Sequence, residues 1–247
     1  MVLLYVVDLD PRITALRALG GFFALRAGED ADRHLPTLAQ AYGPVRRDVH
    51  RADPLTVRVR RVAALRTQEA RVAASVAHQG LAARLWSVTL GCVALHGAVP
   101  DLAPDTLRWD PEGSAPDDLH LPEVRPLPGD AATLAAVVLH GHLEPLSAAL
   151  RARHRVAPAL LRGNAASALA AAAREITRHA RPEAAARAAR LSRELLAHPG
   201  LSGAGGLTAT GFRRRSCCLY YRVPGGGVCG DCCFVRPPRS SPGAPSA

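Results

Sequence analysis

Five of the six cysteines in this 247-residue chain lie within 17 positions near its C-terminal end. They belong to the segment RRRSCCLYYRVPGGGVCGDCCF, residues 213–234. The vicinal pair Cys217 and Cys218 is followed by ten residues, and then by Cys229 and Cys232 with two residues between them. Four thiolates in so small a volume repel one another unless a metal neutralises them. This segment therefore constrains the fold more than any other.

Glycine and proline between the two cysteine pairs predict a tight reversal of the chain. Pro224 favours the start of a turn, and Gly225–Gly227 can take backbone conformations that other residues avoid. Gly230 is expected to give the Cys-x-x-Cys loop the same freedom. The reversal should bring the first pair of thiols close to the second.

The vicinal cysteines also bear on the kind of metal. Structural zinc sites normally use two Cys-x2–4-Cys pairs. Adjacent side chains diverge, so two neighbouring sulfurs reach different positions on a larger object more easily than one ion. A [2Fe–2S] cluster is such an object and takes four cysteines. The spacing favours an iron–sulfur cluster, with zinc as the alternative, while disulfides or redox thiols fit least because vicinal cysteines bridge badly.

The N-terminal run MVLLYVVDLDPR does not have the form of a secretory signal. It lacks a positively charged start, and Asp8 and Asp10 interrupt it. No stretch reaches the roughly 18 apolar residues of a membrane span. We therefore expect a protein of the reducing cytoplasm, where clustered cysteines are more often metal ligands than disulfides.

The net charge of +10 does not by itself indicate nucleic-acid binding. The chain contains no lysine, and its arginines are spread along the sequence instead of forming one stripe. No helix-turn-helix, RNA-recognition or zinc-finger pattern accompanies them. We expect no nucleic-acid partner, although a diffuse positive field can attract an anionic ligand or an acidic protein.

The rest of the chain predicts a mainly α fold, because Ala and Leu dominate a hydrophobic fraction of 48%. Residues 53–62 alternate like a strand, though they could equally lead into the next helix. Within residues 100–130, the pieces TLRW and LHLPEV predict a small β-hairpin, with an irregular loop as the alternative. The expected helices are Ile13–Arg26 interrupted at Gly20–Gly21, Ala31–Tyr42, Ala63–Ala98 broken at Gly80 or Gly91, Ala131–Arg153 kinked or split at Pro145, and two more that begin at Pro158 and Pro182.

These elements predict three parts. Residues 1–206 form a helical domain that contains the β-hairpin. Residues 207–235 form a cysteine-rich, cluster-binding C-terminal cap. Residues 236–247, with almost nothing to bury, form a disordered tail.

The stretch RRRSCCLYYRVPGGGVCGDC resembles the C-terminal signature of the FhuF-like ferric-siderophore reductases. That family carries a [2Fe–2S] cluster on a C-C-x10-C-x2-C pattern. The resemblance places the cluster ligands at Cys217, Cys218, Cys229 and Cys232, and the motif does not require Cys233. Weaker likeness extends to ARLWSVTLG, LRWDPEG and LLRGNAASAL, in the family's order.

The resemblance implies a ferric-siderophore reductase, an oxidoreductase that acts on a metal ion. One electron would convert siderophore-bound Fe(III) to Fe(II) and release it in the cytoplasm, because hard oxygen ligands hold Fe(III) far more tightly. The implied substrate is a ferric siderophore, of the hydroxamate type. No Gly-x-Gly-x-x-Gly follows a strand, so the electron should come from a donor protein or a small reductant. Peripheral contact with an inner-membrane siderophore transporter, at the inner face of the membrane, would suit such a reductase.

Two other functions fit the same residues. One is a non-catalytic iron–sulfur or siderophore-binding protein, which would sense or retain the ligand without turnover. The other is a zinc-stabilised helical module for protein interaction. Access to the cluster separates the first from a reductase, and metal content separates the second.

Further residues carry narrower expectations. Arg213–Arg215 would favour a reduced cluster, unless they are a solvated charge run. Tyr220 and Tyr221 would shield the cluster or pack the cap onto the helices. Asn164, unusual inside a helix, would make a buried hydrogen bond or contact a ligand in a cleft. His140 and His142 form a candidate metal pair, with surface or capping histidines as the alternative, and Trp86 and Cys92 are expected in the core.

Overall fold

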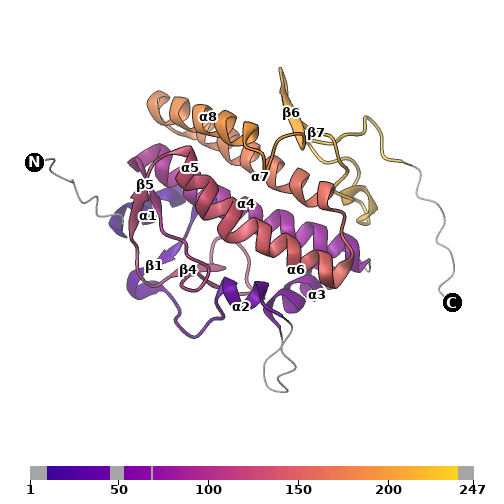
Figure 1. Cartoon of the computed structure of the whole chain (residues 1–247), viewed down its shortest axis with the longest axis horizontal. Coiled ribbons are helices and arrows are strands. Elements are labelled where there is room, and N and C mark those ends of the chain that lie inside the picture. Colours follow the sequence, from indigo (N-terminus) through magenta and orange to yellow (C-terminus); the bar gives the residue numbers. More distant parts are fainter. Residues whose placement is uncertain (1–9, 45–52, 68, 239–247) are drawn as a thin grey trace, which may run out of the picture.

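The computed structural model describes residues 10–44, 53–67 and 69–238 (Figure 1). The apolar N-terminal run and most of the tail expected to be disordered fall outside these residues. The described fold is mainly helical with a few short strands, which confirms the predicted fold class.

Helices form most of the fold. The α-helices are α1 Asp10–Ala15, α2 Leu38–Tyr42, α3 Pro54–Arg66, α4 Ala70–His96, α5 Ala131–Leu134, α6 Glu144–His154, α7 Pro158–His179 and α8 Pro182–Ala197. A π-helical segment, η4 Ala135–Leu143, joins α5 to α6. Short 3-10 turns are η1 Leu16–Leu19, η2 Gly21–Phe23, η3 Gly28–Asp30 and η5 Tyr220–Arg222.

Three small sheets lie around the helices. The first joins β1 Arg26–Ala27, β4 Leu119–Leu121 and β3 Arg108–Trp109, with β1 parallel and β3 antiparallel to β4. The second pairs β2 Ala98–Pro100 with β5 Pro126–Pro128, and the third pairs β6 Gly205–Thr208 with β7 Gly211–Arg214. The β3–β4 pairing confirms the predicted hairpin. The parallel pairing of β1 with β4 was not predicted from the sequence.

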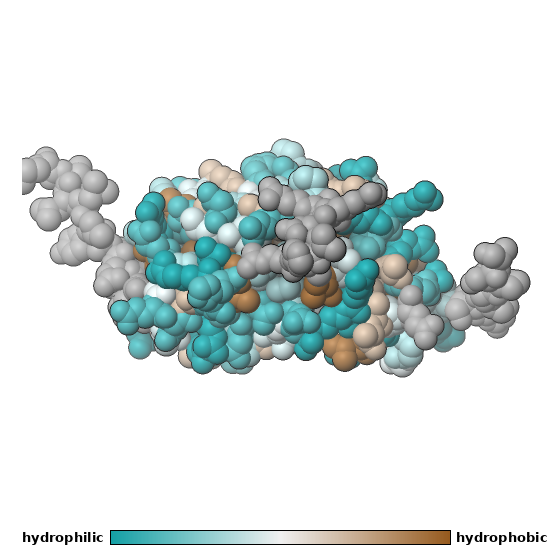
Figure 2. Space-filling model, turned by 90° about the horizontal axis from the view of Figure 1, so that it is seen from below, coloured by the Kyte–Doolittle hydropathy of each residue, from teal (hydrophilic) through white to brown (hydrophobic). Residues whose placement is uncertain are grey.

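Helix α4 forms the centre of the hydrophobic core. It is buried along most of its length, and Trp86 and Cys92 are fully buried within it, as predicted. In Figure 1 it runs through the middle of the molecule, with α7 and α8 on one side and α2 and α3 on the other. The face in Figure 2 is largely hydrophilic with separate hydrophobic patches, and no described helix is long and apolar enough to span a membrane.

Local capping signals fix where the helices begin. Asp53 and Asp130 each accept a backbone hydrogen bond three residues ahead, so they act as N-caps of α3 and α5. Pro158 and Pro182 are the first residues of α7 and α8, where their missing N–H groups would be unpaired in any case. The two latter starts were predicted, whereas the strand alternative for residues 53–62 is wrong, because the Asp-Pro start makes this segment the N-terminal part of α3.

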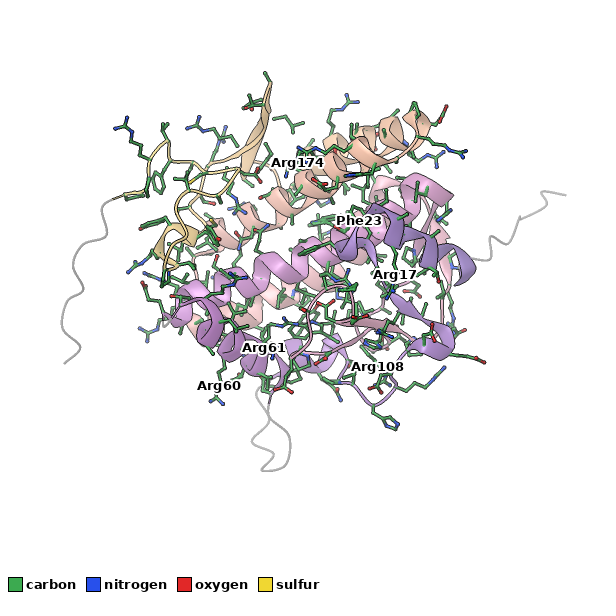
Figure 3. The ribbon with its side chains drawn as sticks, turned by 180° about the vertical axis from the view of Figure 1, so that it is seen from behind. Arg17, Phe23, Arg60, Arg61, Arg108 and Arg174 are labelled. Carbon is green, nitrogen blue, oxygen red and sulfur yellow. The ribbon has the colours of Figure 1, made fainter. Side chains whose placement is uncertain are left out.

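Three predicted helices also differ from the structure. Only the start of Ile13–Arg26 is α-helical: α1 ends at Ala15, the 3-10 turns η1 and η2 follow on either side of Gly20, where the predicted interruption falls, and Arg26 belongs to β1. Helix α4 continues through both Gly80 and Gly91, and the break comes earlier, between α3 and α4. Gly91 serves packing: an added Cβ would collide with the ring of Phe23 on η2, which lies against this helix (Figure 3). Glycine in mid-helix costs about 1 kcal/mol relative to alanine, and close packing offsets that cost here. The helix expected from Ala31 begins only at Leu38, where Thr37 provides a capping box.

The segment expected to kink at Pro145 is instead continuous. Pro145 is the second residue of α6 and follows the wider turns of η4. A proline ring cannot donate the helical hydrogen bond and crowds the preceding turn. The π-helical segment gives that turn more room, so α5, η4 and α6 form one helical rod without a break.

Two histidines are buried inside this helical body and stay neutral. His142 on η4 donates from Nε2 to the carbonyl oxygen of Leu102, at 2.6 Å, and its Nδ1 accepts from the hydroxyl of Tyr42, at 2.9 Å. Burial lowers the pKa of His142 to about 4, against the opposing effect of the Leu102 bond. Burial and the positive charge of Arg214 lower the pKa of His78, on α4, to about 3.

Because the pKa values of both histidines are lowered, we expect the folded protein to lose stability as pH falls below about 6.5, before most carboxylates are protonated. Below pH 6.5 the unfolded chain binds protons that the folded chain excludes, so stability is present above pH 6.5 and is lost as pH falls towards the folded-state pKa values. Each histidine should contribute a slope of up to about 1.4 kcal/mol per pH unit between about pH 6.5 and 5. Urea unfolding across this range measures the slope, and His142→Gln should remove about half of it. An unchanged slope in that variant would contradict the neutral, buried state of His142.

Candidate metal centre

From here on, the C-terminal cap means residues 205–238, which include the predicted segment 207–235 and the whole of β6. The cap packs on α7 near one end of the molecule (Figure 1). It begins with the hairpin β6–β7, in which buried Phe212 joins the main hydrophobic core. The sequence GLSGAGG, residues 200–206, is typical of a linker, but Leu201 and Ala204 within it are buried and its last two residues begin β6. Beyond the hairpin, the cap contains the five clustered cysteines.

The predicted reversal brings the two cysteine pairs together. Gly225 and Gly227 have φ values of 72° and 81°, in the left-handed region that glycine occupies without strain. The Sγ atoms of Cys218 and Cys229 lie 3.5 Å apart as a result. Gly230, in contrast, has no such φ, so the turn between Cys229 and Cys232 does not need glycine at that position.

The sulfurs of Cys218 and Cys229 share one hydrogen bond and are electrostatically linked. This bond lowers the pKa of the Cys218 thiol to about 6, against the opposing effect of burial. It raises the pKa of the Cys229 thiol, and burial adds to that rise. The two sulfurs, one from each cysteine pair, are thus close enough to bind one metal centre together.

The other cysteines lie around this pair. Backbone N–H groups donate to two sulfurs: Leu219 N to Cys217 Sγ at 3.2 Å, and Phe234 N to Cys232 Sγ at 3.4 Å. Burial is the main factor that raises the pKa of the Cys217 and Cys233 thiols, and nearby cysteines add to it. The sixth cysteine, Cys92, is buried in α4, outside this group.

This donor set suits a [2Fe–2S] cluster, since one sulfur of each cysteine pair, from Cys218 and Cys229, already lies 3.5 Å from the other. Within the part of the chain that the structure describes, no three His, Cys, Asp or Glu side chains are arranged to hold one metal ion. A [2Fe–2S] cluster is bound by four cysteines, two on each iron. Its ligands are therefore two pairs of thiols around two metal positions. Amide N–H donors to sulfur are also a usual feature around such clusters.

Arg214 joins the cap to the helices below it. Its guanidinium donates from Nη1 to Asn164 Oδ1 on α7 and from Nη2 to Gln79 Oε1 on α4, both at 2.6 Å. Its backbone N–H donates to the carbonyl oxygen of Asp231, at 2.9 Å. The side chain is buried, with 5% exposed. The alternative of a solvated Arg213–Arg215 run is therefore wrong for Arg214, while both neighbours are exposed.

Asn164 makes buried hydrogen bonds, which was one of the two alternatives predicted for it. Its Nδ2 donates to the backbone oxygen and to Oγ of Ser75, at 3.0 and 3.2 Å. Ser75 Oγ in turn donates to the carbonyl oxygen of Cys218, at 2.7 Å. A chain of polar contacts thus runs from α7 through α4 to one of the clustered cysteines.

Further contacts hold the edges of the cap. Ser167 Oγ donates to Asp231 Oδ2 at 2.5 Å, and Arg174 lies 3.9 Å from the same carboxylate; Figure 3 shows Arg174 on α7 beside the cap. Ser216 Oγ donates to the carbonyl oxygen of Ala159, in a place where a Cβ on Gly163 would collide with that hydroxyl. The cap is therefore attached to the helices through these polar contacts as well as through the apolar packing of Phe212 and Leu219.

A surface depression of about 420 Å³ lies directly beside the cysteines. Cys229 and Cys232 form part of its wall, together with Arg213, Thr210, Phe234 and Val235. Tyr221 packs edge-to-face on Phe234 within the cap, at a ring distance of 6.3 Å, and Tyr220 is exposed. The turn η5 that contains both tyrosines lies against α4, and Arg222 at its end donates to Glu69 Oε1 at 2.9 Å.

The candidate histidine pair is not a metal site. His142 is buried against Tyr42 and Leu102, while His140 is exposed and contacts Glu144, with its Nδ1 3.0 Å from Oε1. The side chains of these two histidines are engaged with different partners. Sequence reasoning did not anticipate the Glu144 contact, which lies one helical turn after His140.

Sequence reasoning also missed three residues of the polar network: Gln79, Ser75 and Asp231. Gln79 and Ser75 lie on α4, more than 130 positions before the cap residues that they contact, and no local pattern distinguishes them from other polar helix residues. Asp231 had a usable signal, since it is the acidic residue inside the Cys-x-x-Cys loop.

The fold and site define a mainly helical protein that ends in a small cysteine-rich domain. Residues 214–234 match the family model described as the FhuF 2Fe-2S C-terminal domain, which confirms the resemblance found in this segment. The match contains all five clustered cysteines, and it assigns a [2Fe–2S] cluster to this domain. No curated protein gave a significant match to the chain.

Proposed function

We propose that this protein is a ferric-siderophore reductase, in which Cys217, Cys218, Cys229 and Cys232 hold the cluster. The 2Fe-2S domain at residues 214–234 is the observation that carries the proposal. A [2Fe–2S] cluster supplies one electron at a time when bound, and conversion of Fe(III) to Fe(II) consumes one electron. Hydroxamate siderophores are the proposed substrates, because their hard oxygen ligands hold Fe(II) poorly and so release it.

The position of the cysteines supports a reductase over a protein that only stores a cluster. Cys229 and Cys232 form part of the wall of a surface depression, so a bulky ferric chelate can approach this edge of the cap. Arg213 lies on the same wall and is exposed, which favours contact with oxygen-rich or anionic ligands. A purely structural metal site would not need such access.

The remaining parts of the proposal concern the protein's surroundings. The electron comes from a donor protein or a small reductant, and iron is released in the cytoplasm. Binding at the inner face of the membrane, next to a siderophore transporter, would place the reductase where its substrate arrives. The division into a helical domain of residues 1–206 and a cluster-binding segment of residues 207–235 remains part of this proposal.

The test is anaerobic and has two stages. Purified protein should be red-brown, bleach with dithionite, and contain about two iron and two sulfide per chain. The reduced protein should then transfer one electron to a ferric hydroxamate, with the cluster spectrum returning as a colorimetric chelator traps Fe(II). A coloured protein that binds the chelate without reoxidation would support the non-catalytic alternative. A colourless protein with one zinc per chain would overturn the cluster itself.

A further inference from the structure

Arg214 is a buried cation that has no carboxylate partner among the described residues. Its guanidinium contacts are the neutral amides of Asn164 and Gln79, both at 2.6 Å. Its Nε is buried and, in the part of the chain that the structure describes, has no hydrogen-bond partner. Burying an unpaired charge in a protein costs several kcal/mol, so an anionic group other than these neighbours is expected to neutralise the guanidinium of Arg214.

The ionisable groups around Arg214 limit which group can neutralise its charge. On α4, His78 is neutral, because burial and Arg214 itself lower its pKa to about 3. In the cap, the carboxylate of Asp231 is engaged with Ser167 and Arg174 on α7. What remains is the group of clustered cysteines, to which Arg214 is joined on two sides. Asn164, which accepts from Arg214, donates to Ser75, and Ser75 donates to the carbonyl oxygen of Cys218. The backbone N–H of Arg214 donates to the carbonyl oxygen of Asp231, inside the Cys229–Cys232 loop.

We propose that Arg214 is the internal counter-charge of the iron–sulfur cluster, and that it raises the cluster's reduction potential. The reduced cluster carries one more negative charge than the oxidised cluster, so a fixed buried cation stabilises the reduced form more. This proposal rests on the cluster being present and does not depend on the substrate of the proposed reductase. Arg214 acts here as a positioning and charge-setting residue and makes no contact with substrate.

The side-chain amides of Asn164 and Gln79 hold Arg214 without cancelling the effect of its positive charge on the sulfurs. A carboxylate at either position would form an ion pair with Arg214 and cancel its field at the sulfurs. Neutral amide oxygens instead fix the direction of the guanidinium fork through two short hydrogen bonds. Gln79 and Asn164 thus hold a cation in place without neutralising it.

The first experiment compares reduction potentials of the loaded protein, measured by dye-mediated anaerobic titration followed in the visible spectrum. In Arg214→Gln the ratio of reduced to oxidised cluster at a fixed ambient potential should fall about tenfold, which is about 59 mV for one electron. Arg214→Lys keeps the charge and should recover most of that change. Arg215→Gln is the matched control, because Arg215 is adjacent but exposed and solvent screens its charge. Equal potentials in the Arg214→Gln and Arg215→Gln proteins would overturn the proposal.

A second variant guards against a folding defect at position 214. Gln79→Glu is isosteric and places a carboxylate where Arg214 already donates, so the apo protein should unfold at higher urea concentration than the wild type. The same substitution should lower the cluster potential, because it cancels the charge of Arg214. A purely structural Arg214 would give the gain in stability with no shift in potential, and that result would also refute the proposal. Neither measurement uses a siderophore, so failure here is distinguishable from failure of the proposed reductase activity.

Discussion

Replacing any one of Cys217, Cys218, Cys229 or Cys232 with serine is expected to abolish the visible chromophore. Iron content should fall from about two per chain to near zero, because a [2Fe–2S] cluster requires four cysteine ligands and a serine hydroxyl is a poor substitute for a soft thiolate. Anaerobic reconstitution followed by visible spectroscopy and iron and sulfide assays measures the effect.

Two cysteines of the same chain provide the controls. Cys92 is fully buried in α4, far from the cap in sequence, and Cys92→Ser should keep the cluster even if it lowers stability. Cys233 lies next to a proposed ligand but outside the C-C-x10-C-x2-C spacing, so Cys233→Ser should also keep the cluster. A colourless Cys233→Ser protein beside a coloured Cys232→Ser protein would show that the ligand set is wrong by one residue.

The parts of the fold that were predictable are those specified by neighbouring residues. Asp130 accepts a hydrogen bond from the backbone of Thr133, and Pro158 and Pro182 pre-set the backbone of a first helical turn. The glycine-rich reversal between the cysteine pairs is equally local. Each of these features operates within a few positions, so the sequence pattern alone was sufficient to place it.

The parts that were not predictable depend on contacts between distant segments. From the sequence alone, Gly91 indicates a helix break. The structure shows instead that Phe23 packs against this position. The parallel pairing of β1 with β4 joins residues more than 90 positions apart. The identity of the buried arginine is a similar case: Arg213, Arg214 and Arg215 are equivalent in the sequence, and only the strand register of β7 turns the middle one towards Gln79 and Asn164.

A second buried arginine fixes the opposite part of the molecule. Arg84 on α4 is 1% exposed, and its Nε donates to Asp118 Oδ1 at 2.7 Å. Its two terminal nitrogens donate to backbone carbonyl oxygens of two other segments. These acceptors are Gly21, Phe22, Ala24 and Pro116. One side chain thus holds the N-terminal 3-10 turns and the loop before β4 against the central helix.

Removing this side chain should produce the largest loss of stability in the helical body. Arg84→Met would remove the hydrogen-bonded partner of the buried Asp118 carboxylate and leave several carbonyl oxygens unpaired, and breaking a buried pair in this way costs about 3–5 kcal/mol. Arg58, whose Nη2 lies 3.9 Å from Asp118 Oδ2, should limit the loss without replacing the hydrogen bonds of Arg84. Urea unfolding of the wild-type and variant proteins gives the difference in free energy.

The exposed pair Arg125–Glu123 is the matched control, because its two hydrogen bonds of 2.9 Å are solvent-screened. Arg125→Met should leave the unfolding midpoint almost unchanged. Arg84→Met with Asp118→Leu should recover part of the loss, since the second change removes the stranded charge. Arg84 also lies about 14 Å along α4 from Ser75, at about 1.5 Å per residue, so folded Arg84→Met protein should still take up its cluster. A midpoint equal to that of Arg125→Met would show that Arg84 is not what holds these segments together.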